Sequence, residues 1–156
     1  MTTKAEFNAE EWATLAAGPM VSGLAVIAAD RGGTVRETFA LAKGIAQEQQ
    51  EGDKPELVQE LLGERPSPKA VLGGDEDKVT RAELPNRTDQ VLREALALLE
   101  AKATPEETDA YKQVCLDIAQ RVAERTKSGD FLGIGGERVS NEEELALDRL
   151  RATLGL

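Results

Sequence analysis

The spacing of helix-start signals constrains this chain more than any other feature of its sequence. A small polar residue recurs three positions before an acidic one, which is the pattern of a capping box: the first side chain accepts a hydrogen bond from an unpaired backbone N–H, and the second reaches back to the N-cap. Each match precedes residues with helical periodicity. Repetition of this signal predicts an all-α protein. The pairs are Asn8 and Glu11, Thr34 and Glu37, Asp53 and Glu56, Asn86 and Asp89, Thr104 and Glu107, and Ser140 and Glu143.

Glycine and proline divide the periodic segments into expected helices. The first helix begins at residue 9 and is interrupted by Gly18-Pro19, and Gly32-Gly33 ends the second. We therefore expect one domain, residues 1–156, folded as an irregular bundle of about six or seven helices. A long irregular connection is expected at about residues 64–85, where prolines and glycines break the periodicity. After the first, the expected helices cover about residues 19–30, 35–51, 54–63, 87–102, 105–127 and 141–154.

Apolar periodicity predicts which side chains form the core. The segment PMVSGLAVIAA, residues 19 to 29, is apolar on nearly every side, which is typical of a central helix. Aromatic residues are only 3% of the chain, so the core must consist mainly of Ala, Leu, Val and Ile. The residues expected to face inward are Phe7 and Trp12 as a hydrophobic staple, then Val35, Phe39, Ala42, Ile45, Ala46, Leu57, Val58, Leu61, Leu62, Val91, Leu92, Ala95, Leu98, Leu99, Tyr111, Val114, Cys115, Ile118, Val122, Leu147, Leu150 and Leu154.

Composition excludes several classes of function. The net charge of −10 and pI of about 4.6 disfavour binding to nucleic acid or to an anionic membrane surface. The absence of histidine removes Ser-His-Asp and Cys-His catalysis and any His-ligated metal. The single cysteine, Cys115, forms no internal disulfide. Because residues 19–29 are too few to span a bilayer and the N-terminal residues do not resemble a signal peptide, we expect a cytoplasmic protein.

The segment GDFLGIGGERVSNEE, residues 129 to 143, is the strongest candidate for a ligand-binding loop. Its glycines do not have the spacing of a dinucleotide-binding fingerprint, and no Lys-Ser or Lys-Thr follows them as in a P-loop. We interpret the segment as a helix end at Gly129, an apolar plug of Phe131, Leu132 and Ile134, and a helix start at Ser140. The sequence thus assigns this loop a structural role.

The other candidates also have structural interpretations. Asp75, Glu76 and Asp77 could suggest a calcium site, but the residues that follow them do not match the ligand positions of an EF-hand loop. We therefore expect a solvated acidic loop. Cys115, Tyr111 and Trp12 lie on apolar stripes, and the paired glutamates stand in the first turns of helices. We therefore assign no catalytic, cofactor-binding or metal-binding residue and expect no cofactor.

The two ends of the chain share a plan: capped helix, Gly-Gly, capped helix. GGTVRETFALA and GGERVSNEEELALD can be laid side by side with a short insertion. An internal duplication and a chance recurrence of helix punctuation are both open interpretations.

The stretch IAADRGGTVRETFAL resembles tellurite-resistance TerB-like helical domains, in which an Ala-rich helix end and an Asp-Gly turn precede a capped helix. VSNEEELALDRLRATLGL, residues 139 to 156, has the same character. The chain is also similar to small uncharacterised bacterial helical proteins that contain an FLGxGG segment. The TerB resemblance implies a divalent-metal or stress-response module, although Arg31 interrupts the Asp-Gly turn. The matching or implied ligand residues are Asp30, Glu37, Asp75, Glu76 and Asp77.

Three functional hypotheses follow. The first is a non-enzymatic protein that acts through protein–protein contact, including self-association as a homodimer, with a broad apolar face on the 87–102 helix as motivation. The second is the TerB-like metal or stress-response module. The third is a metal-dependent hydrolase that uses only carboxylates, into which Glu107 or Glu143 would have to fit.

Overall fold

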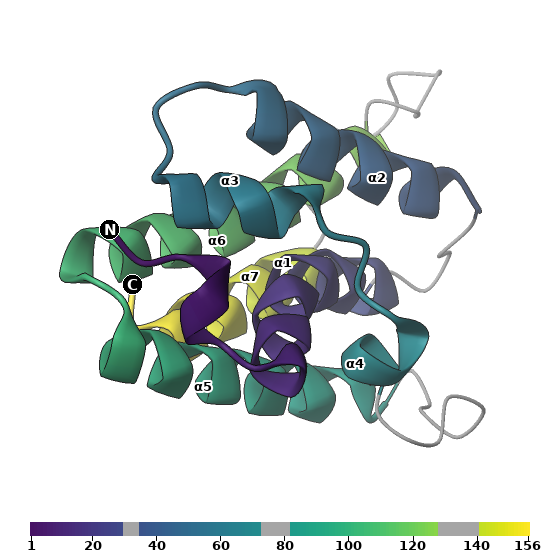
Figure 1. The fold of residues 1–156 in the computed structure, drawn as a ribbon. Coiled ribbons are helices and arrows are strands. Elements are labelled where there is room, and N and C mark those ends of the chain that lie inside the picture. The colour runs from purple at the N-terminus through teal and green to yellow at the C-terminus, as the bar shows by residue number, and fades with distance from the viewer. Residues whose placement is uncertain (30–34, 73–81, 128–140) are drawn as a thin grey trace.

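The computed structural model of the protein describes residues 1–29, 35–72, 82–127 and 141–156. Within these ranges all regular structure is helical, so the predicted all-α bundle of six or seven helices is confirmed. Figure 1 shows the helices gathered around α1. The elements are the short 3₁₀ helix η1 (Lys4–Glu6) and the helices α1 (Ala9–Ala29), α2 (Val35–Gln50), α3 (Glu56–Gly63), α4 (Pro68–Leu72), α5 (Leu84–Lys102), α6 (Pro105–Lys127) and α7 (Asn141–Leu154).

Helix α1 is the centre of the bundle and contacts each of the other α-helices. Its most extensive contacts are with α6 and α5, which run along it for much of its length. Buried residues occur along most of its length, from Trp12 in its first turn to Val26 near its end, which confirms the prediction of a central apolar helix. Burial on several sides explains why this segment lacks the polar face of a surface helix.

The expected break at Gly18-Pro19 is wrong, because α1 continues through both residues. Proline lacks the N–H that would bond the carbonyl four residues earlier, so a proline inside a helix leaves that carbonyl without its usual partner. Here that carbonyl belongs to Leu15, and the hydroxyl of Tyr111 on α6 donates to it at 2.7 Å. A side chain of α6 thus supplies the hydrogen bond that Pro19 cannot make, and α1 continues through the proline.

Gly18 makes this replacement sterically possible. A Cβ atom at position 18 would overlap the hydroxyl of Tyr111, so only glycine allows the ring to approach the backbone of α1. The hydroxyl of Ser22 donates to the carbonyl of Gly18 at 2.8 Å, which satisfies a second polar group within the core. The Gly-Pro pair therefore marks a close helix contact and not a helix boundary.

Two of the predicted capping boxes are present, and two are wrong. Asn8 with Glu11, and Thr104 with Glu107, exchange the expected pairs of bonds at 2.9–3.2 Å. Asp53 does not cap α3, whose N-cap is Pro55. Asn86 lies inside α5, because that helix begins at Leu84 with proline in its first turn. The starts expected at Thr34 and Ser140 lie outside the described residues.

The expected irregular connection at residues 64–85 contains one short helix, α4, and the start of α5. Ser67 begins α4 by accepting the N–H of Ala70 on its hydroxyl at 3.2 Å. Arg87 of α5 then donates to the carbonyls of Ala70 and Val71 at 3.1–3.2 Å, which holds α4 against α5. Residues 73–81 of this connection lie outside the described residues.

Most of the predicted core is buried. The four apolar residues of α3, the stripe of α6, and the inward leucines of α7 are all buried. Phe7 and Trp12 form the expected staple, with ring centroids 6.0 Å apart. On α5, Leu98 is only partly buried, while Val91, Leu92, Ala95 and Leu99 are buried.

The predicted inner face of α2 is wrong. Ala42 and Ala46 are exposed and Ile45 is half-buried, whereas the buried face carries Leu41 and Glu48. Glu48 is drawn inward by ion pairs to Arg121 and Lys54, so an acid occupies a place that the apolar pattern would have given to alanine. The side chains of Val35 and Phe39 lie outside the described residues.

By length and composition α1 is apolar enough to cross a membrane, with a mean hydropathy of 1.6 over its most apolar window. Our expectation that no segment reaches this length depended on the break at Gly18-Pro19, which is absent. Of that window, 56% is buried within the structure. Buried core helices and membrane spans share these properties.

The duplication hypothesis gains no support from the helix contacts. A two-fold relation between the α1–α2 and α6–α7 pairs would make the contact of α1 with α7 equal to that of α2 with α6. The second contact is clearly the more extensive. The Gly-Gly segments themselves lie outside the described residues.

The contact at Gly18 gives the first prediction. Gly18→Ala should lower the free energy of unfolding by about 1–3 kcal/mol, because the new methyl group must displace the Tyr111 hydroxyl from Leu15. Urea titration followed by circular dichroism measures this change.

Gly44→Ala is the matched control, because it is also a mid-helix glycine but the nearest side-chain atom to its new Cβ is 3.8 Å away. Better helix propensity should make this variant more stable by about 0.5–1 kcal/mol. Equal effects of the two substitutions would contradict the proposed role of Gly18.

Candidate functional site

Several residues singled out in the sequence lie outside the described part of the chain. These are the glycine-rich segment up to Ser140, the acids Asp75 to Asp77, Asp30, and the side chain of Glu37. The metal site implied by the TerB resemblance therefore stays a prediction. Among the described residues, no three His, Cys, Asp or Glu side chains are grouped so that they could hold a metal ion.

Glu107 was considered above for carboxylate catalysis, but both of its carboxylate oxygens accept hydrogen bonds from backbone N–H groups. Its Oε1 accepts the N–H of Thr2 at 2.9 Å, and its Oε2 accepts the N–H of Thr104 at 2.9 Å. Burial alone would raise the pKa of the Glu107 carboxyl, but the hydrogen bonds from Thr2 and Thr104 bring it below its ordinary value. Glu107 therefore fastens the N-terminal segment to the start of α6.

Cys115 and Tyr111 are buried core residues, as expected from their positions on the α6 stripe. Burial raises the pKa of the Cys115 thiol to about 12, so the thiolate needed for nucleophilic chemistry is scarce at neutral pH. Burial also raises the pKa of Tyr111, which keeps its hydroxyl protonated as the donor to Leu15.

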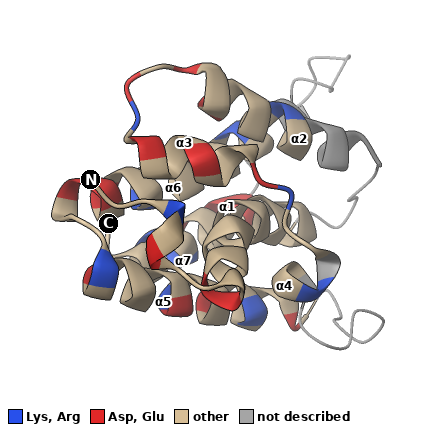
Figure 2. Ribbon diagram, viewed as in Figure 1, with Lys and Arg blue, Asp and Glu red and all other residues tan. Residues whose placement is uncertain are grey.

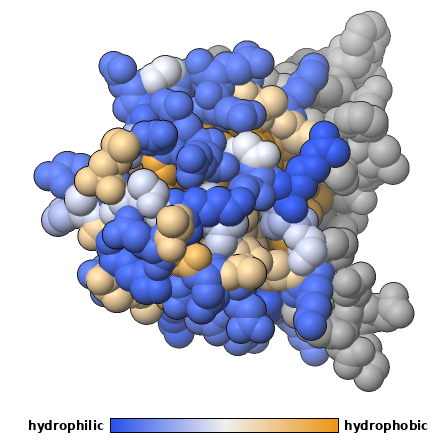
Figure 3. Space-filling model, in the orientation of Figure 1, coloured by the Kyte–Doolittle hydropathy of each residue, from blue (hydrophilic) through white to orange (hydrophobic). Residues whose placement is uncertain are grey.

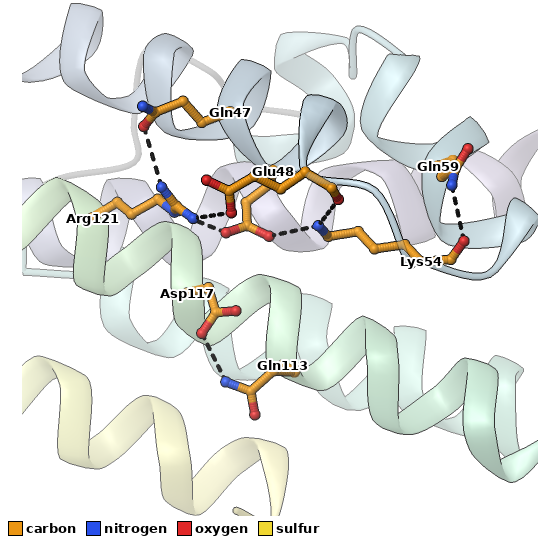
Figure 4. Close-up of polar contacts among 8 residues, drawn as sticks. Gln47, Glu48, Lys54, Gln59, Gln113, Asp117 and Arg121 are labelled. Carbon is orange, nitrogen blue, oxygen red and sulfur yellow. Dashed lines mark hydrogen bonds and ion pairs between the residues drawn. The ribbon is translucent and has the colours of Figure 1, made fainter.

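A buried ion cluster joins α2 to α6 (Figure 4). Glu48, 2% exposed, receives Arg121 Nε at 2.8 Å on one oxygen and Lys54 Nζ at 3.2 Å on the other. The same guanidinium reaches Glu51 at 2.5 Å and Gln47 at 3.3 Å. Burial alone would lower the pKa of Arg121, but the pairing with Glu48 raises it. Because Nε, Nη1 and Nη2 of Arg121 all donate within the cluster, it joins the two helices and leaves none of these nitrogens without an acceptor.

A groove with a volume of about 540 Å³ lies between α1, α2 and α3. Its floor is apolar, and its outer wall carries the alanines that the sequence had placed in the core. Figure 3 shows apolar surface in the hollow between α2 and α3, surrounded by hydrophilic residues. The residues that line the groove are Ala16, Pro19, Met20, Ala42, Ile45, Ala46, Gln49, Leu61, Leu62, Gly63, Glu64, Arg65 and Pro66.

The charged residues among those that line this groove are Glu64 and Arg65. Glu64 and Arg65 follow the end of α3, and Glu64 pairs with Lys4 at 2.6 Å. The hydrogen bond from Lys4 lowers the pKa of the Glu64 carboxyl, and the nearby indole N–H of Trp12 favours the same charged form. A mainly apolar lining with a few polar residues is suited to binding.

Comparison of the chain with protein-family models, with curated proteins and with solved structures gives no match.

Sequence reasoning missed both the ion cluster and the groove. The cluster joins Glu48 to Arg121, more than seventy positions away, and no local pattern distinguishes Glu48 from Glu37 on the same helix or from Glu51 just after it. The groove left one signal in the sequence, the apolar stripe of Ala42, Ile45 and Ala46, which we assigned to the core.

Glu107 gives a prediction for pH dependence. A carboxyl whose folded pKa is depressed contributes stability that is present above its unfolded pKa and is lost as the pH falls through its folded pKa. Glu107→Gln should therefore cost about 1–2 kcal/mol near neutral pH, and this difference from the unsubstituted protein should shrink below about pH 4.5. Urea titrations at several pH values measure it.

Glu106→Gln is the control, because Glu106 is exposed in the same helical turn. A difference between wild type and Glu107→Gln that stays constant down to about pH 3 would refute the assignment.

The ion cluster gives a third prediction. Arg121→Met should lower the free energy of unfolding by about 2–3 kcal/mol, because Glu48 would remain buried with only Lys54 beside it. Arg151→Met, which breaks the exposed pair with Asp148, should cost less than about 1 kcal/mol. Thermal and urea unfolding measure the free energy of unfolding of both variants. Equal losses of stability in the two variants would show that the Glu48 cluster does not hold α2 against α6.

Proposed function

We propose that this protein acts by binding a partner protein, and that the groove between α1, α2 and α3 receives the apolar face of an amphipathic helix from that partner. The observation that carries the proposal is the stripe of Ala42, Ile45 and Ala46. These residues recur at helical spacing, yet the fold leaves two of them exposed and one half-buried. An apolar stripe that no part of the described chain covers is suited to a covering partner.

The volume and lining of the groove support a helical ligand. About 540 Å³ lies within the range of pockets that enclose organic ligands or the anchor side chains of a peptide. Small side chains at positions 42 and 46 allow a partner backbone to approach α2 closely, while Met20 adds a flexible apolar surface. A helix that lays successive apolar side chains into such a groove is a recurrent mode of recognition.

Charge favours a basic partner. The chain carries a net charge of −10, and Figure 2 shows acidic residues on α3, a helix that lines one side of the groove. Glu56 and Glu60 are exposed there, and Glu64 stands at the rim. Lysine or arginine at the flanks of a partner helix would meet this field and associate faster.

The proposed contact surface lies on α2 and not on α5. The apolar face of α5, which we expected to exceed the needs of the core, is largely buried against α1. Among the described residues, α2 carries an apolar stripe that is left uncovered at the groove.

The test uses a synthetic amphipathic peptide in place of the unknown partner: a helix of leucine and lysine with leucines at positions i, i+3, i+4 and i+7. We expect binding with a dissociation constant on the order of 10–100 µM, and NMR shifts centred on the groove residues. Ala46→Lys should weaken binding at least about tenfold, because it places a charge on the apolar wall.

Ala97→Lys on α5 is the matched control, since it makes the same substitution at an exposed helical alanine outside the groove. A second control peptide replaces every leucine with serine. Equal weakening by the two lysine variants, or equal binding of the two peptides, would show that only general charge attraction operates and would end the proposal.

A further inference from the structure

We propose that a second copy of this chain binds through one lateral face of α7, in an antiparallel two-fold contact centred between Leu145 and Ala146. The face consists of Glu142, Leu145, Ala146 and Arg149, which are spaced at i, i+3, i+4 and i+7 and therefore lie on one side of the helix. It is separate from the inner face of α7, whose buried residues are Glu143, Leu147, Leu150 and Leu154.

The exposure of Leu145 is the first observation. Its exposed fraction is 68%, and among the described residues the only other large apolar side chains exposed to this degree or nearly so are Met1 and Leu156, at or near the ends of the chain. Leu145 alone stands within a helix. Single exposed leucines are common, so this observation needs the geometry around it.

The surface beside Leu145 is hollow. A recess of about 230 Å³ lies between α7, the last turns of α1 and the first turns of α5. Several of the side chains that line it are small: Ala25, Ala28 and Ala29 come from α1, and Ala146 comes from α7. An apolar cavity of about 150 Å³ accommodates a benzene molecule, so this recess has room for an aliphatic side chain. A protruding leucine and a recess that receives it therefore stand side by side on one surface.

The charges on the same face are self-complementary. Glu142 and Arg149 are equally far from the midpoint between Leu145 and Ala146, and about 10 Å apart along the helix axis. A two-fold axis through that midpoint reverses the second helix, so Glu142 of each copy lies opposite Arg149 of the other. In an isologous dimer, a contact of residue i with residue j is repeated as a contact of j with i, so this arrangement would form the Glu142–Arg149 pair twice.

Arg149 is already held in position for this role. Its Nε and Nη2 donate to Asp89 at 3.0 and 2.7 Å, and Nη2 also donates to Asn86 at 2.8 Å. These bonds fix the guanidinium on α5, while Nη1 donates to none of the described residues. An arginine held in place through one edge loses little entropy when its remaining donor meets a carboxylate.

The size of the contact sets the expected strength. One helix pair with two leucine knobs buries less surface than the roughly 1,200–2,000 Å² of standard stable complexes. We expect a reversible dimer with a dissociation constant on the order of 10–100 µM. Sedimentation velocity over a range from about 5 µM to about 1 mM should show a shift from monomer to dimer.

Charge reversal provides the decisive experiment. Glu142→Arg and Arg149→Glu each place like charges opposite one another in a homodimer, so each alone should dimerise at least about tenfold more weakly. An equimolar mixture of the two variants restores unlike charges at both contacts, and it should associate about as strongly as the unsubstituted protein. Leu145→Ala should weaken dimerisation in every background.

Glu144→Arg is the matched control. It makes the same substitution in the same first turn, with the same cost to the helix dipole, but on the opposite side of α7. Circular dichroism confirms that each variant folds, and the groove variant Ala46→Lys should dimerise normally. A protein that stays monomeric at about 1 mM, a mixture that does not regain association, or equal effects of Glu142→Arg and Glu144→Arg would each overturn the proposed contact.

Discussion

The hydrogen bond from the Tyr111 hydroxyl to the Leu15 carbonyl is the interaction on which the arrangement of the bundle depends. Pro19 removes the helical donor for that carbonyl, and the bond at 2.7 Å replaces it inside the core, where no water is available to a buried carbonyl. Gly18 clears the space for the tyrosine ring. Three residues from two helices thus form one unit, since each would be unfavourable without the others. The unit fixes α6 against the middle of α1, and the other helices pack around this pair.

From the α1–α6 pair, the position of α2 follows through charge. Arg121 on α6 pairs with Glu48 on the inner side of α2, and a Cβ at Gly44 would meet Arg121 at 3.8 Å, so the two helices are close at this point. The burial of Glu48 orients α2 about its own axis. Once this acid faces α6, Ala42 and Ala46 are turned toward the side of α3, where the groove lies. The groove is therefore a consequence of how α2 is oriented.

Much of the fold could be predicted from the sequence, because helix starts and apolar periodicity are local signals. The capping boxes at Asn8 and Thr104 fixed two helix starts, and the stripes of α3, α6 and α7 identified core residues correctly. The wrong predictions concern positions whose structure is decided by contacts with residues far away in the sequence. Pro19 signalled a break because its compensating donor is on another helix, and Asn86 resembled a cap although it holds Arg149. The inner face of α2 was misassigned because apolar periodicity takes no account of the ion pair between Glu48 and Arg121, which forms only in the folded chain.

A groove with this origin differs from a packing defect. Interiors pack densely because an unfilled space loses contact energy, and a bundle could close this gap by rotating α2 to bury its alanines. Such a rotation would turn the carboxylate of Glu48 toward solvent. It would also separate this carboxylate from Arg121 and Lys54, its present ion-pair partners. The hydrogen bonds that Arg121 would lose to Glu48, Gln47 and Glu51 contribute more than the burial of two alanine methyl groups, since each methyl contributes about 1 kcal/mol or less. The ion cluster thus holds the groove open, and its apolar wall can be covered only by a surface from outside the described chain.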